Sequence, residues 1–254
     1  MRVELLHCTP LEVCSGAVRT CWASQEKSDT KEDFWLCPEC NWESDTGALT
    51  PLDNLGQISC PECNDADVSH IRSRVGEADK ELIDRVGNKF KHKSVLEHLS
   101  YNFFIHGISR ALLQELARHR TAKISVKSSR YTLKELKKED EFWDFNDSSD
   151  YKRAEKFVRF TSNIDVNRSI FKSLESLRLL IKKGISNDIA KYAMPESYKT
   201  EATWTMDARN LQSFLSLRSD KAALWEIREL AHAIFNQIPL EHRYLFTDYI
   251  KEGN

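Results

Sequence analysis

The periods with which apolar and polar residues alternate along this chain predict a mixed α+β fold. Residues 101–108 are aromatic and β-branched, and residues 200–206 alternate between polar and apolar side chains, so both are predicted strands. A shorter apolar segment, Val3–Leu6, opens the chain and is followed by a turn at Thr9 and Pro10.

Other segments have the spacing of amphipathic helices. Helices are predicted at residues 17–23, 79–90, 109–117, 154–161, 169–181, 208–217 and 222–236. Asp207 and Asp220 can cap the last two helices, and Ser94 with Glu97 has the spacing of a capping box that starts another helix. The charged segment 135–150 has no clear period, and we predict a mobile connection there.

Length and composition indicate an ordinary soluble protein. The chain has 254 residues, of which 41% are hydrophobic and 30% charged, enough for one large core and a small additional module. It contains neither an apolar run of about 20 residues nor a signal-peptide pattern at its start, so we expect the cytoplasm and no membrane partner. The seven cysteines are then expected to be thiols or metal ligands instead of disulfides.

Four of these cysteines form a repeated motif, in which Cys-Pro-Glu-Cys-Asn occurs at residues 37–41 and again at residues 60–64. Two Cys-x-x-Cys pairs at this separation fit a four-thiolate zinc site. Idle thiols or a redox pair are the alternatives, but redox chemistry needs only one pair. The predicted ligands of a structural zinc ion are Cys37, Cys40, Cys60 and Cys63.

The segment around these cysteines, residues 31–77, differs in composition from the rest of the chain. It carries ten acidic residues against three Lys or Arg. Nucleic-acid-binding ribbons are normally basic, so this module is expected to have a structural role or to contact a protein, and the sequence does not choose between the two.

A local concentration of positive charge follows the predicted helix 109–117. Its charged residues are six bases and one acid: Arg118, His119, Arg120, Lys123, Lys127, Arg130 and Glu115. Hydroxyl groups lie between them, and guanidinium forks with hydroxyls are suited to phosphate oxygens. There are two alternatives: the cations interact with the negative C-terminal end of the helix dipole, or they form a solvent-exposed charged face. The sequence has no glycine-rich phosphate loop, so side chains would have to hold any phosphate.

This stretch resembles the signature of flavin-dependent thymidylate synthases, because Arg118-His119-Arg120 is followed after seven residues by Ser128-Ser129-Arg130-Tyr131. Residues 92–98 and 207–218 extend the resemblance, which covers residues 1–30 and 78–254, the predicted catalytic domain. Residues 31–77 lie outside the family pattern and are predicted to be an inserted zinc-ribbon-like module.

The resemblance implies an α+β homotetramer with active sites between subunits, where FAD-dependent chemistry makes dTMP from dUMP. It also implies methylenetetrahydrofolate as carbon donor and NADPH as reductant. The implied flavin contacts are His92, Ser94, Arg118, His119, Arg120, Asp207, Arg209 and Ser213. The implied dUMP contacts are Glu115, Arg118, Ser128, Ser129, Arg130, Lys191 and Arg218, of which Arg218 is the catalytic residue that polarises the pyrimidine.

Four positions depart from the family pattern and leave their ligand contacts open. Asp207 and Ser213 stand where Asn is usual, Val126 replaces Glu or Gln, and Lys191 replaces Arg. Two other functions are considered: a zinc-ribbon nucleic-acid-binding protein whose basic stretch holds phosphates, and a flavoprotein scaffold that has lost its activity. The acidic module and the net charge of −2 argue against nucleic acid as the partner.

Overall fold

The computed structural model describes residues 1–45, 50–51 and 58–251. It divides into two compact units, one made of Met1–Cys8 with Ser100–Asn254 and the other of Thr9–Leu99. The predicted insertion 31–77 lies inside the second unit. No helix in the described part of the chain is long and apolar enough to span a membrane.

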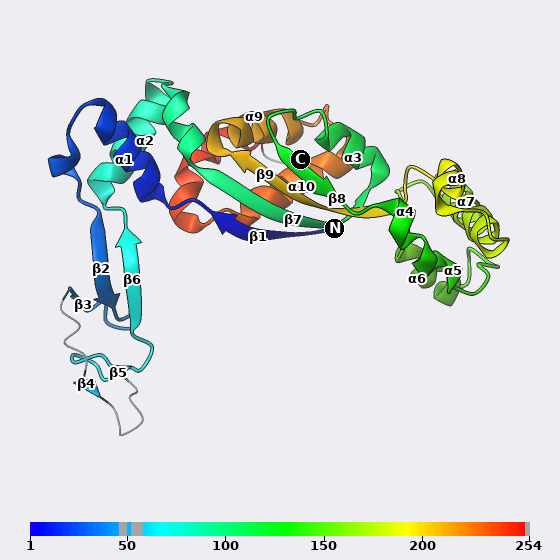
Figure 1. The fold of residues 1–254 in the computed structure, drawn as a ribbon, viewed down its shortest axis with the longest axis horizontal. Coiled ribbons are helices and arrows are strands. Elements are labelled where there is room, and N and C mark those ends of the chain that lie inside the picture. The colour runs from blue at the N-terminus through cyan, green and yellow to red at the C-terminus, as the bar shows by residue number, and fades with distance from the viewer. Residues whose placement is uncertain (46–49, 52–57, 252–254) are drawn as a thin grey trace. The chain divides into compact units, whose positions relative to one another are not determined.

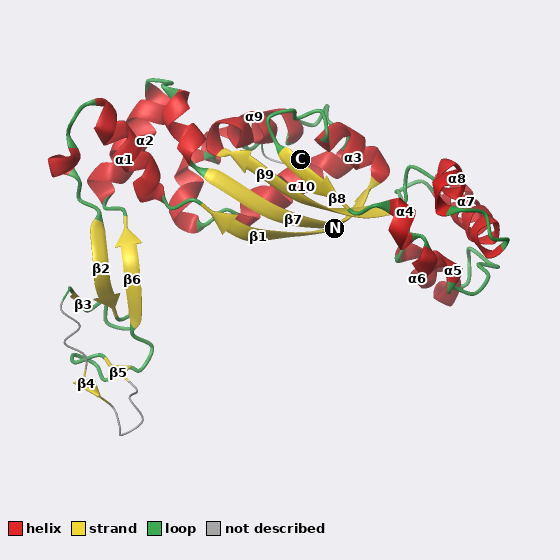
Figure 2. Cartoon of the chain, in the orientation of Figure 1, coloured by secondary structure: helices red, strands yellow, loops and turns green. Residues whose placement is uncertain are grey.

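The first unit is built on a four-stranded antiparallel sheet in the order β1-β7-β9-β8 (Figures 1 and 2). Its strands are β1 (Arg2–Cys8), β7 (Ser100–Ser109), β8 (Lys123–Val126) and β9 (Lys199–Asp207). Alternate residues of β7 and β9 are buried, as the predicted two-residue period requires. The expected strands at residues 101–108 and 200–206 are therefore confirmed.

Two helices, α9 (Ala208–Arg218) and α10 (Trp225–Gln237), pack against this sheet. The buried rings of Trp204 and Phe214 meet at 5.0 Å between β9 and α9. Asp207 caps α9 by accepting a hydrogen bond from the Asn210 N–H, as predicted. The predicted start of α10 at residue 222 was wrong, because Asp220 caps only a turn and pairs with Lys251.

A helical layer of the first unit follows β8. It consists of α4 (Ser129–Thr132), α5 (Lys134–Lys137), α6 (Ser148–Glu155), α7 (Ile164–Lys182) and α8 (Asn187–Ala190). Leu136 and Phe142 are buried in one cluster with Phe171 and Leu174 of α7, so the prediction of a mobile connection at 135–150 was wrong. The predicted helix 154–161 was also misplaced, because Val158 forms an isolated β-bridge with Tyr198.

The second unit joins α1 (Leu11–Cys21) and α2 (Glu77–Asp84) to an antiparallel ribbon, β2 (Lys31–Leu36) with β6 (Ser69–Arg74). Its short strands are β3 (Glu43–Ser44), β4 (Thr50–Pro51) and β5 (Ile58–Ser59). A buried ion pair between Arg19 and Asp79 joins the helices. The Asp79 carboxylate also accepts hydrogen bonds from the hydroxyls of Ser28 and Thr30, the residues that precede β2.

The predicted capping box in the second unit was wrong. Residues Lys93–His98 form a short 3-10 helix whose N-cap is His92 and not Ser94, and the His92 side chain makes no capping hydrogen bond. Val95 and Leu96 are buried, and Gly87 on the preceding π-helical turn lies so close to Leu96 that a Cβ atom would approach it to 2.8 Å. Burial of these two apolar residues thus fixes the turn that leads to β7.

Candidate active site

A cluster of charged side chains forms where the end of α9 meets the end of α3 (Arg110–Leu116) in the first unit. The Arg218 Nε donates a hydrogen bond to His119 Nε2 at 2.9 Å. Its two terminal nitrogens donate to the Glu115 carboxylate at 2.8 Å and to the Glu115 carbonyl at 3.3 Å. We call Glu115, His119 and Arg218 the arginine cluster. It unites residues that are about a hundred positions apart in sequence.

His119 is held as a neutral base in this cluster. Burial, followed by the charge of Arg218, lowers its pKa to about 4, so the imidazole is uncharged at neutral pH. The ring also meets Phe214 edge-on at 4.9 Å between centroids. A neutral His119 can therefore accept the Arg218 hydrogen bond and fix the direction of the guanidinium.

The guanidinium of Arg218 keeps capacity for another ligand. It has five N–H groups, and three of them serve His119 and Glu115. Only 11% of the side chain is exposed, so water screens its charge weakly. The two remaining N–H groups can donate to oxygens of a bound molecule and stabilise negative charge on it.

The neighbouring cations of the signature are more open. Arg118 is 73% exposed and lies 3.5 Å from Glu115, while Arg120 is exposed and has no ion-pair partner among the described residues. Arg209 and Ser213 lie on the exposed face of α9. These side chains supply positive charge and hydrogen-bond donors that could meet an anionic cofactor.

The carboxylate of Asp207 is already occupied by its own helix. One oxygen accepts from the Asn210 backbone, and the other accepts from the Asn210 side chain at 2.6 Å. Val126, at the end of β8, is exposed and offers no polar group. Asp207, one of the four departures from the family pattern, therefore serves mainly as a helix cap.

A second polar group gathers around Arg130. Its guanidinium forms a two-point ion pair with Asp188 of α8, at 2.6 Å and 3.2 Å, and its carbonyl accepts from the Asn187 side chain. Ser128 is exposed just before α4. The sequence analysis did not identify Asn187 and Asp188 as site residues. An Asn-Asp pair at the start of a helix indicates only a helix cap.

Lys191 is in the short turn Lys191–Ala193 that follows α8, and its ammonium lies 5.9 Å from the centre of the exposed Tyr192 ring. The remaining predicted flavin contacts, His92 and Ser94, belong to the second unit, where both are exposed. The predicted site is therefore distributed over the arginine cluster, the Arg130 group and the second unit.

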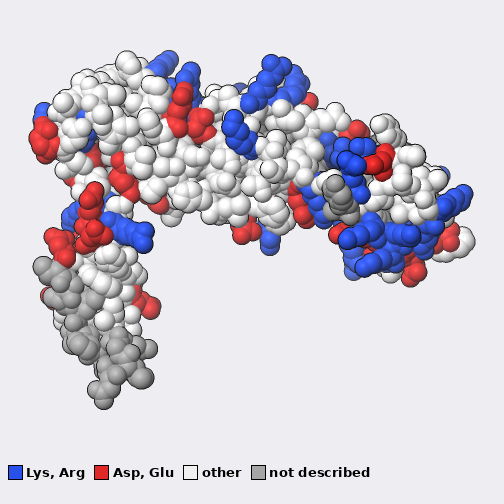
Figure 3. All heavy atoms as spheres, in the orientation of Figure 1, with Lys and Arg blue, Asp and Glu red and all other residues white. Residues whose placement is uncertain are grey.

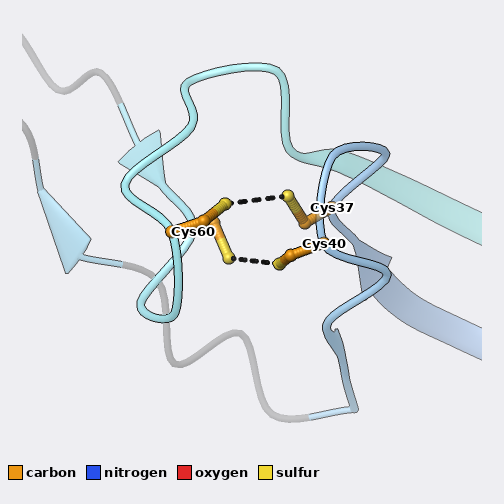
Figure 4. A group of neighbouring side chains, drawn as sticks. Cys37, Cys40 and Cys60 are labelled. Carbon is orange, nitrogen blue, oxygen red and sulfur yellow. Dashed lines mark hydrogen bonds between the residues drawn. The ribbon is translucent and has the colours of Figure 1, made fainter.

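The four predicted metal ligands come together in the second unit (Figure 4). The sulfurs of Cys37 and Cys63, and those of Cys40 and Cys60, are 3.5 Å apart, and all four lie within 4.8 Å of one another. Disulfide sulfurs are only about 2.05 Å apart, so no pair is bridged. Tetrahedral zinc with Zn–S of about 2.3 Å requires sulfurs separated by about 3.8 Å, which this arrangement fits.

The two Cys-x-x-Cys turns have matching backbone geometry. Asn41 and Asn64 adopt left-handed conformations with φ of 59° and 61°, and their N–H groups donate to the carbonyls of Cys37 and Cys60. Burial opposes ionisation of Cys60, but the N–H groups of Cys63 and Glu62 lower its pKa to about 7. The two turns thus offer four Sγ atoms in matching geometry to one cation.

Comparison with known proteins identifies the group to which this chain belongs. The model of the family described as "Thymidylate synthase complementing protein" matches residues 4–241. The chain is 50% identical over 246 residues to the flavin-dependent thymidylate synthase of Wolinella succinogenes, with 97% of each chain covered. The chain belongs to the flavin-dependent thymidylate synthase family. Its sheet and helices accordingly have that family's mixed α+β fold.

Further relatives agree along the whole length. The Campylobacter jejuni flavin-dependent thymidylate synthase is 48% identical over 97% of this chain and 96% of its own. Thymidylate synthase X from Helicobacter pylori, crystallised with FAD and dUMP, is 44% identical, with a TM-score of 0.79 over 99% of this chain and 100% of its own. Alignments of this length include most of residues 31–77. These members of the family therefore share the segment that lies outside the family motifs given in the sequence analysis.

Proposed function

We propose that this protein makes dTMP from dUMP as a flavin-dependent thymidylate synthase, with methylenetetrahydrofolate as carbon donor and NADPH as reductant. Family membership supports the reaction, and the Helicobacter pylori relative was crystallised with FAD and dUMP. The observation that carries the proposal is the oriented, weakly screened guanidinium of Arg218. It suits a group that must stabilise charge on a pyrimidine carbonyl.

In this proposal Arg218 donates to a uracil oxygen with the N–H groups that His119 and Glu115 leave available. A cation at that oxygen stabilises the negative charge that the uracil amide carries in the activated ring. His119 and Glu115 hold the guanidinium in place before substrate arrives, so little reorganisation is needed. Arg130 and Lys191 are proposed to meet the dUMP phosphate together with Arg118, Ser128 and Ser129.

The exposed cations of the first unit fit the diphosphate of FAD chemically. Arg118, Arg120 and Arg209 can form charge-assisted hydrogen bonds to phosphate oxygens. His119, Asp207, Ser213 and, from the second unit, His92 and Ser94 complete the proposed contacts. When bound, FAD supplies the hydride chemistry that protein side chains lack. A homotetramer with active sites between subunits, and a cytoplasmic location, stay predictions of the family resemblance and the sequence.

The test is the visible spectrum of the purified protein together with dTMP formation. We expect a yellow protein that releases FAD on denaturation and converts dUMP to dTMP only when NADPH and methylenetetrahydrofolate are both supplied. Omission of each component in turn is the control. A colourless protein that takes up no added FAD would refute the proposal. A protein that binds FAD and dUMP without forming dTMP would instead be an inactive scaffold of the same family.

We also propose that Cys37, Cys40, Cys60 and Cys63 hold one structural zinc ion, so that residues 31–77 act as an inserted zinc-ribbon-like module. The four sulfurs have the separation of a tetrahedral site, and the Cys37 and Cys60 side chains are buried. Elemental analysis of the purified protein is expected to give about one zinc per chain. A protein with no bound metal after purification without chelator would contradict this site.

A further inference from the structure

A cationic cavity lies beside the start of β9 in the first unit. Its volume is about 100 Å³, and it opens between the sheet and the helical layer of the first unit. The cavity is lined by cations and hydroxyls that we call the cation pocket: Arg110, Lys127, Lys156, Lys199, Ser129 and Thr200. None of the four cations belongs to the flavin or dUMP contacts proposed above.

The pocket and the arginine cluster are lined by different residues. Arg110 of the pocket begins α3, and Glu115 of the cluster lies near the end of the same helix. Only Ser129 of the pocket lining is shared with the proposed dUMP contacts, and no residue of the arginine cluster lines the pocket.

Charge in the pocket is not balanced by its own acids. Four cations face two carboxylates, those of Glu135 and Glu201. Lys127 lies 3.9 Å from Glu135 and 3.8 Å from Glu201, too far for direct hydrogen bonds. The surplus of about two positive charges matches a phosphate group, which carries about −1.5 to −2 charges at pH 7.

Two cations of the pocket have unused hydrogen-bonding capacity. The half-buried guanidinium of Arg110, at the start of α3, has no hydrogen-bond or ion-pair partner in the described part of the chain. The ammonium of Lys156 has none either within the described residues. A buried or half-buried fork without a partner is costly, and a bound oxyanion would satisfy it.

Lys199 is a half-buried cation that also faces a guanidinium outside the pocket lining, that of Arg159. Burial, followed by the charge of Arg159, lowers the pKa of its ammonium, while its Nζ donates to the Glu155 carbonyl. Lys and Arg side chains also gather on the surface over the helical layer (Figure 3). An anion would therefore be attracted from solvent toward the pocket.

We infer that the cation pocket binds a phosphate group, and that this is a site separate from the substrate and flavin sites. Arg110 and Lys156 supply donors that have no other partner among the described residues, and Lys127 can turn from its carboxylates, 3.8 Å and 3.9 Å away, to the anion. The ligand is either free phosphate or the phosphate of a phosphomonoester, because both present the same oxygens.

Calorimetric titration of the full-length, metal-loaded protein with inorganic phosphate tests the pocket. The measurement is made in chloride buffer with dUMP at saturation, so that the substrate site is filled. Lys156→Ala is expected to weaken phosphate binding by about tenfold, the loss of one charge-assisted hydrogen bond. Lys152→Ala is the matched control, because Lys152 is exposed on α6, which ends just before Lys156, and does not line the pocket. It is expected to change binding less than twofold.

Several outcomes would overturn the inference. They are the absence of phosphate binding once dUMP is saturating, or equal weakening by Lys156→Ala and Lys152→Ala. Arg110→Gln, which keeps a polar side chain, provides a second variant that should also weaken binding by about tenfold or more. Both pocket variants should leave dUMP affinity unchanged, which separates this inference from the proposed function.

A second titrant identifies the source of the phosphate group. Ribose 5-phosphate is compared with inorganic phosphate under the same conditions. Binding of inorganic phosphate alone supports a site for the free ion, and binding of both supports a site for a phosphomonoester. In either case the Lys156→Ala variant must weaken the interaction that is observed.

Discussion

The sheet of the first unit and the cysteine end of the second unit are stabilised by different means. Around β7 and β9, aromatic side chains such as Phe103, Trp204 and Phe214 are completely buried. At the cysteine end the buried cluster contains, among the described residues, only Cys37, Cys60 and Val68, with Trp35 and Trp42 packed at its edge. Apolar burial can hold the sheet together, whereas a cluster this small is expected to depend on the proposed zinc ion.

This contrast teaches that one chain can combine two independent kinds of stability. Loss of apolar contacts should affect the sheet and leave the metal site intact, and loss of a thiolate should do the reverse. Each of the following variants separates the two.

The largest expected effect comes from removing one thiolate. Cys37→Ser should abolish stoichiometric zinc binding, because structural zinc sites in small peptides contribute about 10–16 kcal/mol of apparent binding free energy. Metal analysis and limited proteolysis measure the result, with new cleavage expected between residues 31 and 74. Cys21→Ser is the control, since Cys21 is an exposed thiol outside the cluster. Full zinc content in Cys37→Ser would contradict a metal-stabilised ribbon.

Truncating a buried aromatic side chain should lower the stability of the first unit and leave zinc binding unchanged. Phe103→Ala is expected to lower the unfolding free energy of the first unit by about 3–5 kcal/mol, the cost of lost burial and of the cavity left behind. Zinc content should not change. Denaturant unfolding followed by circular dichroism gives the free energy, and Trp143→Ala, at a 79% exposed aromatic residue, is the control. Equal effects of the two variants would disprove the assignment of Phe103 to the core.

Removing the oriented guanidinium should affect turnover more than either kind of stability. Arg218→Ala is expected to reduce kcat by about 10²–10³-fold, the usual loss when a preorganised donor to developing negative charge is removed. Arg168→Ala is the control, because Arg168 is exposed on α7 and pairs only loosely with Asp165. Circular dichroism and zinc content are measured in parallel. Unchanged kcat in Arg218→Ala would remove that residue from the reaction.

The smallest effect is a pH dependence of the first unit. The folded-state pKa of His119 is lowered to about 4 from an ordinary value of 6.5, so the unfolded chain binds the proton more tightly. Stability from this residue is therefore complete above about pH 6.5 and is lost as the pH falls toward 4. Denaturant unfolding between these limits should show a smaller loss in His119→Gln. An identical loss in both proteins would exclude His119 as the titrating group.

Features set by local sequence were the most predictable. Alternation identified β7 and β9, Asp207 was recognised as a helix cap, and the repeated Cys-Pro-Glu-Cys-Asn motif gave the four sulfurs that come together. Each of these depends on the chemistry of a few neighbouring residues. The family signature then supplied the roles of the basic residues.

Features set by distant partners could not be predicted in this way. Nothing near Arg218 in the sequence indicates that Glu115 and His119, about a hundred residues earlier, orient it. The pairing of Arg130 with Asp188 is equally remote in sequence. The capping box at Ser94 failed for the same reason, because the burial of Leu96 in the tertiary fold determines that turn.

The carboxylate of Asp79 has a consequence for how the ribbon joins its helical base. Its hydrogen bonds hold Ser28 and Thr30 at the start of α2. The first residue pair of the antiparallel ribbon beyond them is Lys31 with Arg74. Opposed residues in antiparallel strands have Cα atoms only about 4.5–5.5 Å apart, a gap that a tight turn can close. The chain therefore leaves and re-enters its helical base at almost one point. The whole cysteine arm can therefore be inserted or removed between two neighbouring points of the backbone without any change to the scaffold beneath it.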